Sequence, residues 1–575
     1  PRHWSITDSI LVGLHMYRDL TTTWRDEAIK ARMTAKGDRN LVEQLFPVRS
    51  GRDFSPGSNA WVVSGKWTTS GKPLLANDTH LEFTIPSTWY MLHREAPGLN
   101  VSGEALPGVP AIIIGHNDRI AWGVTNLQFD VQDLYIEQLN LSNGQYAFAG
   151  RVEQARPERE YIRVKGERPV EFVNWVTRHG PILTNAGGRE LTLRWAAAEL
   201  AKFEFPLVQL NQAGNWSEFR AALARFPGPG QNFVYSDTDG NIGYQATGRL
   251  PIRRNHRGDY PVDGSSGKFE WEGFIPFEQL PHAFNPATGY IITANQNPFP
   301  AEYPYQVSGN FAAPYRAEQI RARLLSRKGW KAEEFLAIQK DVYSPLLHFL
   351  GQQAVRAADK RGLKDGEVSP AVELLRNWNG QVEKGTAAPV IAQLLYQHLR
   401  RAIAERAAPG SGDEYSATLA GPVVERLLRD RPAGWFQDYD QVLMRALLDA
   451  LEEGKRKQGR NPQKWDYGVF IELNLKQPVG SQIPVVGPYF NIGPVPMSGS
   501  STTVKQTTQR TGPSMRFIAD LGNWDNSLNN ITIGQSGQFL SWHYKDQWDE
   551  YYIGKGLPMR WTKVEGSTLR VVPKR

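Results

Sequence analysis

The sequence predicts an α+β protein in which helices pack on the outer faces of antiparallel sheets. Apolar residues recur at helical spacing in residues 1–50 and again in residues 315–457. Between these blocks, residues 58–292 consist of short apolar runs separated by turn residues, and strand character returns after residue 458. Strands and helices in long separate blocks indicate antiparallel sheets with helices outside them.

The first block is predicted to form three short helices. Asp8 can cap a helix over residues 9–22, whose apolar residues share one face. Two more helices are predicted over residues 25–34 and 40–45. Pro47 and the polar stretch that follows it end this helical block.

The second block is predicted to consist of strands and hairpins. Apolar runs flank Asn117-Asp118 and Asp239-Gly240, which predicts a tight turn at each dipeptide. A helical insert is predicted at residues 217–226. The predicted strands cover residues 73–76, 111–115, 120–124, 131–138, 161–164, 170–176, 191–195, 233–236 and 242–245.

The remainder of the chain is predicted to be helical first and then stranded. The predicted helices cover residues 317–325, 332–339, 371–378, 390–407, 422–429 and 441–453. The predicted strands cover residues 470–473, 514–519 and 568–572. The Gly-, Pro- and Ser-rich region at residues 479–501 is predicted to be a surface loop.

The composition is that of a globular protein and excludes several kinds of site. With 575 residues, of which 40% are hydrophobic and 22% charged, the chain can form several structural regions or one large layered domain. The formal charge of +7 is spread without a long basic block, which favours solubility over nucleic-acid binding. The absence of cysteine excludes disulfides and thiolate chemistry, and no apolar run is long enough to cross a membrane.

The junction Gly57-Ser58 lies between a flexible segment and an apolar strand. If the chain were cut there, the Ser58 hydroxyl would lie beside a free α-amino group with an unperturbed pKa of about 7.7–8.0. That amine can act as the base for the hydroxyl, so one residue would supply nucleophile and base. In an uncut chain, Ser58 would be an ordinary loop residue before a strand.

Two acidic segments are candidate calcium sites. The segment Asp130-Val131-Gln132-Asp133 offers two carboxylates and a carbonyl, which are hard oxygen ligands, but it also fits a solvated strand end. The segment from Asp237 to Asn241 lacks the spacing and the closing glutamate of a calcium loop, which favours a hairpin turn.

Other candidate catalytic residues are ambiguous by themselves. His80 follows the strand at residues 73–76, where the residues alone favour a hydrogen-bonded structural histidine over a catalytic one. Ser265 and Lys268 match an S-x-x-K pattern but lie in a predicted turn. The sequence contains no HExxH motif, no Walker A motif, no dinucleotide fingerprint and no GxSxG elbow.

A set of short motifs gives these residues a common context. The motifs lie at residues 58–61, 77–80, 107–110, 115–117, 121–126, 130–133, 232–237, 240–244, 534–537 and 543–547. They begin with Ser58-Asn59-Ala60-Trp61 and end with His543-Tyr544-Lys545-Asp546-Gln547. In this order, from about residue 8 to the C-terminus, the chain resembles the penicillin acylase family of N-terminal-nucleophile hydrolases.

The resemblance implies a four-layer αββα sandwich and a precursor that cleaves itself between Gly57 and Ser58. The expected organisation is a partial small-subunit segment at residues 1–49, a spacer at 50–57 and a large subunit at 58–575. Within the large subunit we expect a β-rich catalytic part at residues 58–314, a helical part at 315–457 and a β-rich part at 458–575.

The implied activity is hydrolysis of the amide bond of a small acylated amine through an acyl-enzyme on Ser58. The resemblance assigns the oxyanion donors to the backbone N–H of Asn126 and the side-chain amide of Asn232. It places His80 where it can hydrogen-bond the Ser58 hydroxyl or backbone. It places Arg253 near the site, to hold the Asn232 loop or a polar part of the substrate.

The resemblance also implies one structural calcium ion that ties the small subunit to the large one. The implied ligands are Glu27, Asp130, the carbonyl of Gln132 and Asp133, with Pro206 and Asp237 as further candidates. The implied acyl pocket contains Tyr17, Thr21, Leu81, Ile114 and Gln128, with Trp24 nearby. These residues depart from an aromatic phenylacetyl pocket, so an aliphatic or polar acyl group is an equal expectation.

Two further expectations concern the cell and the alternative function. The resemblance implies a periplasmic or secreted protein, although this chain begins at Pro1 and contains no signal peptide, as a processed form or a fragment would. The alternative to an enzyme is an inactive binding protein that retained the fold. A calcium-dependent carbohydrate-binding protein is a third reading, which would need exposed aromatic platforms.

Overall fold

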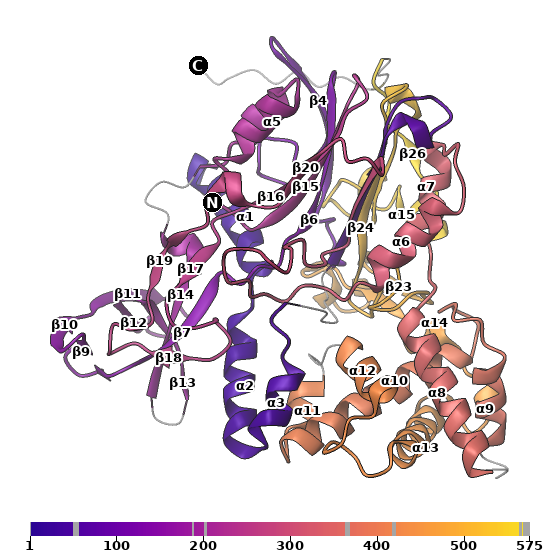
Figure 1. The fold of residues 1–575 in the computed structure, drawn as a ribbon. Helices are drawn as coiled ribbons and strands as arrows, with labels where there is room; N and C mark the ends of the chain where they lie inside the picture. The colour runs from indigo at the N-terminus through magenta and orange to yellow at the C-terminus, as the bar shows by residue number, and fades with distance from the viewer. Residues whose placement is uncertain are drawn as a thin grey trace.

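The computed structural model describes residues 2–49, 57–186, 189–199, 204–362, 368–416, 421–562 and 566. The predicted strand at residues 568–572 and most of the predicted spacer therefore lie outside the described residues. Two large antiparallel sheets form the centre of the molecule (Figure 1).

The two central sheets collect strands from distant parts of the chain. The first sheet has the order β21 (Tyr290–Thr293), β1 (Gly57–Val63), β2 (Leu74–Glu82), β24 (Thr511–Asp520), β25 (Leu528–Ile531) and β26 (Leu557–Pro558). The second sheet has the order β20 (His282–Phe284), β16 (Ile242–Thr247), β15 (Gln231–Asp237), β6 (Ile120–Asn126), β5 (Ile114–Asn117), β4 (Leu99–Ala105) and β3 (Tyr90–Ala96). Both predicted hairpins are confirmed, since β5 pairs with β6 and β15 with β16.

Helices cover the two outer faces, so that the layers run helix, sheet, sheet, helix (Figure 1). The helices α4 (Leu207–Gln212) and α5 (Trp216–Leu223) pack on the second sheet. The helices α6 (Tyr315–Leu325), α7 (Ala332–Gln339) and α15 (Trp548–Ile553) pack on the first sheet. This arrangement confirms the predicted α+β class and the αββα sandwich.

Strand β1 is buried on both faces because it lies in the middle of this sandwich. Ala60 and Val62 belong to the apolar cluster between the sheets, whereas Trp61 and Val63 belong to the cluster under α6 and α7. The ring centroids of Trp61 and Phe335 of α7 lie 5.7 Å apart. Side chains that alternate between two buried faces each contribute about 1.5–3 kcal/mol and fix the register of the strand.

A separate helical body lies beside the sandwich and has its own apolar core. Its helices are α8 (Pro345–Arg361), α9 (Ser369–Arg376), α10 (Ala388–Ala407), α11 (Gly412–Ser416), α12 (Gly421–Asp430), α13 (Tyr439–Gln458) and α14 (Tyr467–Phe470). The sequence analysis missed α8, which begins with Pro345 at its first position and a Ser344 cap that accepts from Leu347 N at 3.1 Å. Residues 470–473 are mostly the end of α14 and the loop before β22 (Leu473–Leu475), not a strand.

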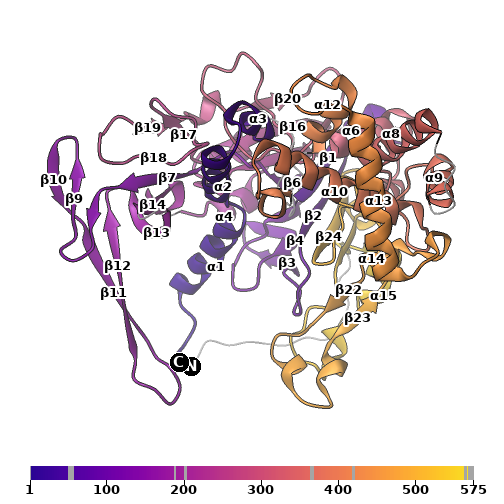
Figure 2. The same cartoon turned by 90° about the horizontal axis from the view of Figure 1, so that it is seen from below.

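The N-terminal helices α1 (Ile6–Asp19), α2 (Trp24–Lys36) and α3 (Arg39–Leu45) lie between the arm described below and the rest of the molecule (Figure 2). Asp8 is not the N-cap that we predicted. Ser5 occupies that position, and the Asp8 carboxylate accepts from Ser5 N at 2.7 Å, so the helix begins earlier than predicted.

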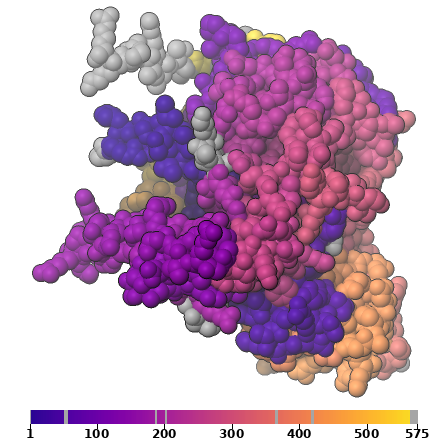
Figure 3. Space-filling view, turned by 60° about the vertical axis from the view of Figure 1, so that its left-hand side comes forward, coloured from indigo at the N-terminus to yellow at the C-terminus, as the bar shows by residue number. Residues whose placement is uncertain are grey.

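A second set of strands forms an arm that projects from the sandwich (Figures 1 and 3). Its main sheet has the order β11 (Arg156–Ile162), β12 (Val170–Thr177), β13 (Gly180–Ala186), β14 (Arg189–Trp195), β7 (Gln132–Glu137) and β18 (Val262–Asp263). A three-stranded sheet contains β8 (Leu139–Asn140), β9 (Gln145–Phe148) and β10 (Arg151–Gln154). Two further sheets have two strands each: β17 (Pro251–Arg253) pairs with β19 (Trp271–Phe274), and β22 pairs with β23 (Ile492–Val495).

In the described part of the chain no helix is both long and apolar enough to span a membrane.

Candidate active site

Ser58 is the second residue of β1 and lies opposite Thr79 of β2. Its side chain is buried and borders an apolar pocket of about 100 Å³. The walls of this pocket come from both sheets, from α1 and from the segments around α4 and α5. They include Met16, Leu20, Thr79, Leu81, Trp89, Val124, Asn126, Phe205, Phe226 and Phe233. A hydroxyl at the edge of an apolar pocket is well placed to meet the acyl side of a substrate.

Asn295 connects the Ser58 hydroxyl to its surroundings. Its Nδ2 donates to Ser58 Oγ at 3.2 Å and to the Asn126 carbonyl at 2.9 Å. Its Oδ1 accepts from the backbone nitrogen of Ser58 at 2.8 Å. Asn295 has a φ of 67°, a left-handed conformation that asparagine adopts more readily than most residues. One amide side chain therefore fixes both atoms of Ser58 that an N-terminal nucleophile would use.

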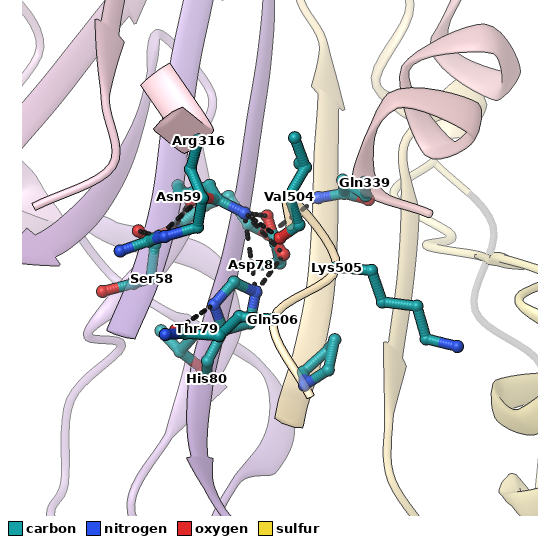
Figure 4. Close-up of polar contacts among 12 residues, drawn as sticks. Ser58, Asn59, Asp78, Thr79, His80, Arg316, Gln339, Val504, Lys505 and Gln506 are labelled. Carbon is teal, nitrogen blue, oxygen red and sulfur yellow. Dashed lines mark hydrogen bonds and ion pairs between the residues drawn. The ribbon is translucent and has the colours of Figure 1, made fainter. Parts of the chain in front are cut away.

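Arg316, at the start of α6, is the second residue that holds Ser58. Its Nη1 donates to the Ser58 carbonyl and to Asn59 Oδ1, both at 2.8 Å, and its Nη2 donates to Asn295 Oδ1 at 2.9 Å. Figure 4 shows the guanidinium alongside Ser58 and Asn59. Burial lowers the pKa of Arg316 to about 10, although Asp78 opposes this shift, so the side chain keeps its positive charge at neutral pH.

The two predicted oxyanion residues lie on adjacent strands, with Asn232 of β15 opposite Thr125 of β6. The Asn232 Nδ2 donates to Thr125 Oγ1 at 3.1 Å and to the Asn126 carbonyl at 3.2 Å. Its Oδ1 accepts from the Tyr244 hydroxyl at 2.5 Å, which fixes the orientation of the amide. Since Asn295 donates to the same Asn126 carbonyl and to Ser58, the structure brings these residues together. Their oxyanion role stays a prediction.

We expected His80 to hydrogen-bond Ser58, and the structure places it elsewhere. Neighbouring residues of a strand point to opposite faces, and His80 lies opposite Gly57, so its ring is on the face away from the Ser58 side chain. There its Nε2 lies 2.6 Å from Asp78 Oδ2 and its Nδ1 lies 3.1 Å from Gln506 Oε1 (Figure 4). Burial lowers the pKa of His80, and the contact with Asp78 opposes that shift.

Gly57 packs closely against the side chain of Gln506. A Cβ atom there would lie 2.1 Å from Gln506 Oε1 and 3.1 Å from Arg316 Nη2. Because the first distance is far below contact distance, a larger residue before Ser58 would push the Gln506 amide away from His80.

Arg253 is also placed differently from our expectation. It lies among the predicted calcium ligands and not beside Ser58. Its Nε donates to Asp133 Oδ2 at 2.9 Å, and its Nη2 donates to the Asp130 carbonyl at 2.9 Å. The Nη2 atom also lies 3.1 Å from Asp130 Oδ2. Asp133 and Asp130 raise the pKa of Arg253, although burial alone would lower it.

The predicted calcium ligands do converge. Glu27 of α2 accepts from Leu134 N at 3.1 Å, and burial together with Asp133 and Asp130 raises its pKa. Burial raises the pKa of Asp130 to about 7, although Arg253 opposes the shift. Glu27 Oε1 and Asp130 Oδ2 have no hydrogen-bond partner among the described residues. Yet nowhere in those residues are three or more His, Asp or Glu side chains arranged to hold a metal ion.

The other candidate ligands have roles of their own. The backbone nitrogen of Gln132 donates to Asp130 Oδ1 at 3.2 Å. Pro206 precedes α4 as its N-cap residue. Asp237 Oδ1 accepts from Asn241 N at 2.9 Å, which confirms the interpretation of this segment as a hairpin turn.

Of the five predicted pocket residues, only Leu81 lines the pocket at Ser58. Tyr17 points away from it toward Trp195, with ring centroids 5.3 Å apart, because the face of α1 that meets the pocket holds Gly13, Met16 and Leu20. Thr21 donates to the Tyr17 carbonyl at 2.8 Å, at the end of this helix. Ile114 is core, and its neighbour Ile113 lines the pocket instead. Gln128 is buried outside the pocket lining with a φ of 59°.

Neither Asn295 nor Arg316 is predicted from the sequence. The sequence does contain a signal for Arg316, because it lies on the same helix face as Ile320 and Leu324. A charged residue on an apolar face indicates a buried cation that has polar partners. Asn295 follows β21 in a segment without regular structure, and nothing in the local pattern identifies it.

Comparisons with known proteins give this geometry a family. A model of the family described as penicillin amidase matches residues 1–567. The chain is 30% identical over 522 residues to penicillin acylase 2 proenzyme of Pseudomonas sp. (strain SE83), a match that covers 85% of this chain and 65% of that protein. It is 26% identical over 560 residues to acyl-homoserine lactone acylase QuiP of Pseudomonas aeruginosa, covering 87% of this chain and 66% of that protein.

A solved structure agrees with the fold. Thermostable penicillin G acylase from Alcaligenes faecalis superimposes with a TM-score of 0.70 at 20% identity, over 90% of this chain and 100% of that chain. The chain spans just under two thirds of the length of the two curated relatives. Because the family model matches nearly the whole chain, the chain belongs to the penicillin amidase family.

Proposed function

We propose that the protein is an acylase that hydrolyses the amide bond of a small acylated amine through an acyl-enzyme on Ser58. The observation that supports this best is the Ser58 hydroxyl, held by Asn295 at the edge of an apolar pocket. The names of the relatives, a penicillin acylase and an acyl-homoserine lactone acylase, suggest the substrate class.

The proposal includes self-cleavage between Gly57 and Ser58. Ser58 Oγ attacks the Gly57 carbonyl carbon, the C–N bond breaks as the proton passes to the nitrogen, and water hydrolyses the resulting ester. The missing Cβ of Gly57 allows the close packing against Gln506 and Arg316 in which the bond is presented. The reaction leaves Ser58 with a free α-amino group.

That amino group is proposed to be the base for the Ser58 hydroxyl. It would lie where the amide nitrogen now lies, 2.8 Å from Asn295 Oδ1. The positive charge of Arg316 disfavours a second cation beside it, so the pKa of the amine falls below its usual value of about 7.7–8.0. A neutral amine at physiological pH can take the proton from Oγ as the hydroxyl attacks.

The tetrahedral intermediate requires donors for its oxyanion. We assign them to the Asn126 backbone N–H and the Asn232 amide, which lies beside Asn126 and is oriented by Tyr244. The amine of the substrate leaves with the proton, and water then releases the acid from Ser58. The apolar lining of the pocket, with Phe205, Phe226 and Phe233, favours an apolar acyl group.

The test is Ser58→Ala, analysed by mass spectrometry and by release of free acid from a panel of acyl amides, acyl-homoserine lactones and penicillins. We expect wild-type protein to contain a fragment that begins at Ser58 and to hydrolyse part of the panel, and the variant to stay uncut and inactive. A variant that still splits and hydrolyses would overturn the proposal. An uncut wild-type chain that binds these compounds without hydrolysis would favour the alternative, an inactive binding protein.

We also propose a structural calcium ion held by Glu27, Asp130, the Gln132 carbonyl and Asp133. Support comes from the charge balance, because three buried carboxylates face one guanidinium and Glu27 Oε1 has no hydrogen-bond partner among the described residues. The ion would tie α2 to β7 and take no part in the reaction. Metal analysis of the purified protein tests this. One equivalent of calcium, with a lower Tm after chelation, is expected, and a metal-free protein that chelators leave unchanged would assign the role to Arg253 alone.

Export to the periplasm or the medium is a further proposal, which rests on the resemblance alone. Fractionation of cells that express the full gene, with detection of the Ser58 fragment, would test it.

A further inference from the structure

A second pocket, of about 270 Å³, lies on the outer side of the first sheet, opposite to the face that carries the Ser58 side chain. It is formed where the end of α7, the end of α15 and the loops at residues 383–384 and 496–498 meet β24. Four of its wall residues are cationic, and one is an acid. These are Lys340, Lys384, Lys505, Arg516 and Glu383.

The four cations have no carboxylate partner of their own. Among the described residues no ion pair joins any of them to an acid. Lys384 Nζ donates to the Tyr552 hydroxyl at 2.8 Å, and Arg516 Nη1 donates to the Tyr551 carbonyl at 3.2 Å. Arg516 is 3% exposed, and its Nε has no hydrogen-bond partner in the described part of the chain.

Of the nearby acids, Asp78 and Asp341 have partners outside the pocket, and Glu383 is the one acid in the pocket wall. Asp78, the cross-strand neighbour of Arg516, is bonded by Asn59 and His80. Glu383 accepts from Ser498 Oγ at 2.9 Å. Asp341, which follows Lys340, pairs with Arg323 at 3.2 Å. The pocket therefore has an excess of positive charge that the protein itself does not balance.

Lys505 is the residue most affected by this excess. Burial lowers the pKa of its ammonium to about 7, with Arg516 adding to the shift and Glu383 opposing it. Its side chain extends away from Ser58 (Figure 4). Grouping like charges in a partly buried pocket costs free energy, which an anion bound among them would recover.

We propose that this pocket binds a small oxyanion of the phosphate type, free or as the phosphate group of a larger molecule. Several cations that converge from different elements match a group with more than one negative charge better than a single carboxylate. Val342, Pro496, Met497 and Ile553 give the pocket an apolar wall, which suits an organic part attached to the phosphate.

The experiment measures binding of inorganic phosphate by calorimetry and by the shift in Tm, at constant ionic strength adjusted with sodium chloride. Wild-type protein should bind phosphate and gain stability, and chloride at the same ionic strength should not reproduce the gain. Lys505→Gln should weaken binding by about tenfold or more, since it removes one charge-assisted hydrogen bond. The matched control is Lys328→Gln, at a lysine that lies over the Trp67 ring elsewhere, and it should bind as wild type does.

A second variant and a second ligand complete the test. Lys340→Gln changes an exposed residue and should also weaken phosphate binding. The test therefore remains valid even if the Lys505→Gln variant does not fold. Glycerol phosphate binding more tightly than inorganic phosphate would identify a phosphate group on a larger molecule, and equal binding would identify the free ion. No phosphate-specific stabilisation of wild type, or equal binding by wild type and both variants, would overturn the proposal.

Discussion

Two arginines are buried in this molecule to almost the same extent, and they are held in opposite ways. Arg253 lies between the carboxylates of Asp130 and Asp133. Arg316 bonds only oxygens of neutral groups, which are the Ser58 carbonyl and the amide oxygens of Asn59 and Asn295. Their pKa values differ accordingly. Asp133 and Asp130 raise the pKa of Arg253 against the effect of burial, whereas burial lowers the pKa of Arg316 to about 10.

The comparison distinguishes a structural charge from one that acts on its surroundings. The field of Arg253 is cancelled locally by two acids, so its contribution is to hold β17 against the segment around Asp130 and Asp133. Arg316 forms no ion pair within the described part of the chain, although the charge of Asp78 is near enough to oppose the lowering of its pKa, and its guanidinium bonds the Ser58 carbonyl directly.

Arg253→Met should give the largest effect, a loss of about 3–5 kcal/mol in the free energy of unfolding, because it leaves buried carboxylates without their cation. Denaturant unfolding of the purified variant measures this. The protein that remains folded should keep its rate of amide hydrolysis. A variant with wild-type stability, or one that is stable but inactive, would contradict the structural role.

Arg316→Met should reduce the rate of amide hydrolysis by about 10²–10³, a loss comparable to that of one preorganised oxyanion-hole donor. The pH–rate profile gives a second readout. If the α-amine of Ser58 is the base, as proposed above, activity should be lost as pH falls through the pKa of that amine. Without Arg316 this pKa rises, so the loss should begin at higher pH. Arg316→Lys should restore part of the profile. An unchanged profile in Arg316→Met would show that the charge does not act on the amine.

Glu104 extends the comparison to a buried acid that forms no ion pair among the residues the structure describes. Burial raises its pKa to about 8, and only Asn529 opposes the shift. The folded protein therefore keeps this proton up to about pH 8, whereas the unfolded chain releases it near pH 4.3. The associated stability is present below about pH 4 and is lost as pH rises through 8, by up to about 1.4 kcal/mol per pH unit in between.

Glu104→Gln should remove that dependence. The Tm of wild type should fall relative to that of the variant between pH 5 and pH 9, as measured by thermal unfolding in matched buffers. Parallel curves would mean that Glu104 is ionised in the folded protein.

The smallest effect is expected at an exposed pair. Arg119 and Asp239 lie 3.0 Å apart with more than half of each side chain exposed. Arg119→Met should change the free energy of unfolding by less than about 1 kcal/mol, because water already screens both charges. A larger loss in denaturant unfolding would show that burial is not what separates Arg253 from an ordinary surface pair.

Local patterns in the sequence were sufficient to predict the fold class. The hairpins at residues 117–118 and 239–240 and the helix at Ala332–Gln339 are predicted correctly because turn residues and apolar spacing are local signals. The pairing of β2 with β24 could not be predicted in this way, since it joins residues from opposite ends of the chain.

The site shows the same limit at finer scale. The motif order predicted Ser58, Asn126 and Asn232, which the structure brings together. The face of a strand or helix was harder to predict. His80 lies one residue out of phase with Ser58, and α1 is rotated so that Met16, not Tyr17, meets the pocket. Arg253 and Arg316 could be told apart only from three-dimensional contacts.

The position of β1 inside its sheet has a consequence for a chain cut before Ser58. New chain ends usually fray, because nothing restrains their first residues. Here Ser58 pairs with Thr79 of β2, and β21 joins the other edge of β1 from Ala60 onward. A terminus released at this point would already be held by its strand neighbours. Its amino and hydroxyl groups would therefore be oriented in advance, and little conformational entropy would be lost when a substrate binds.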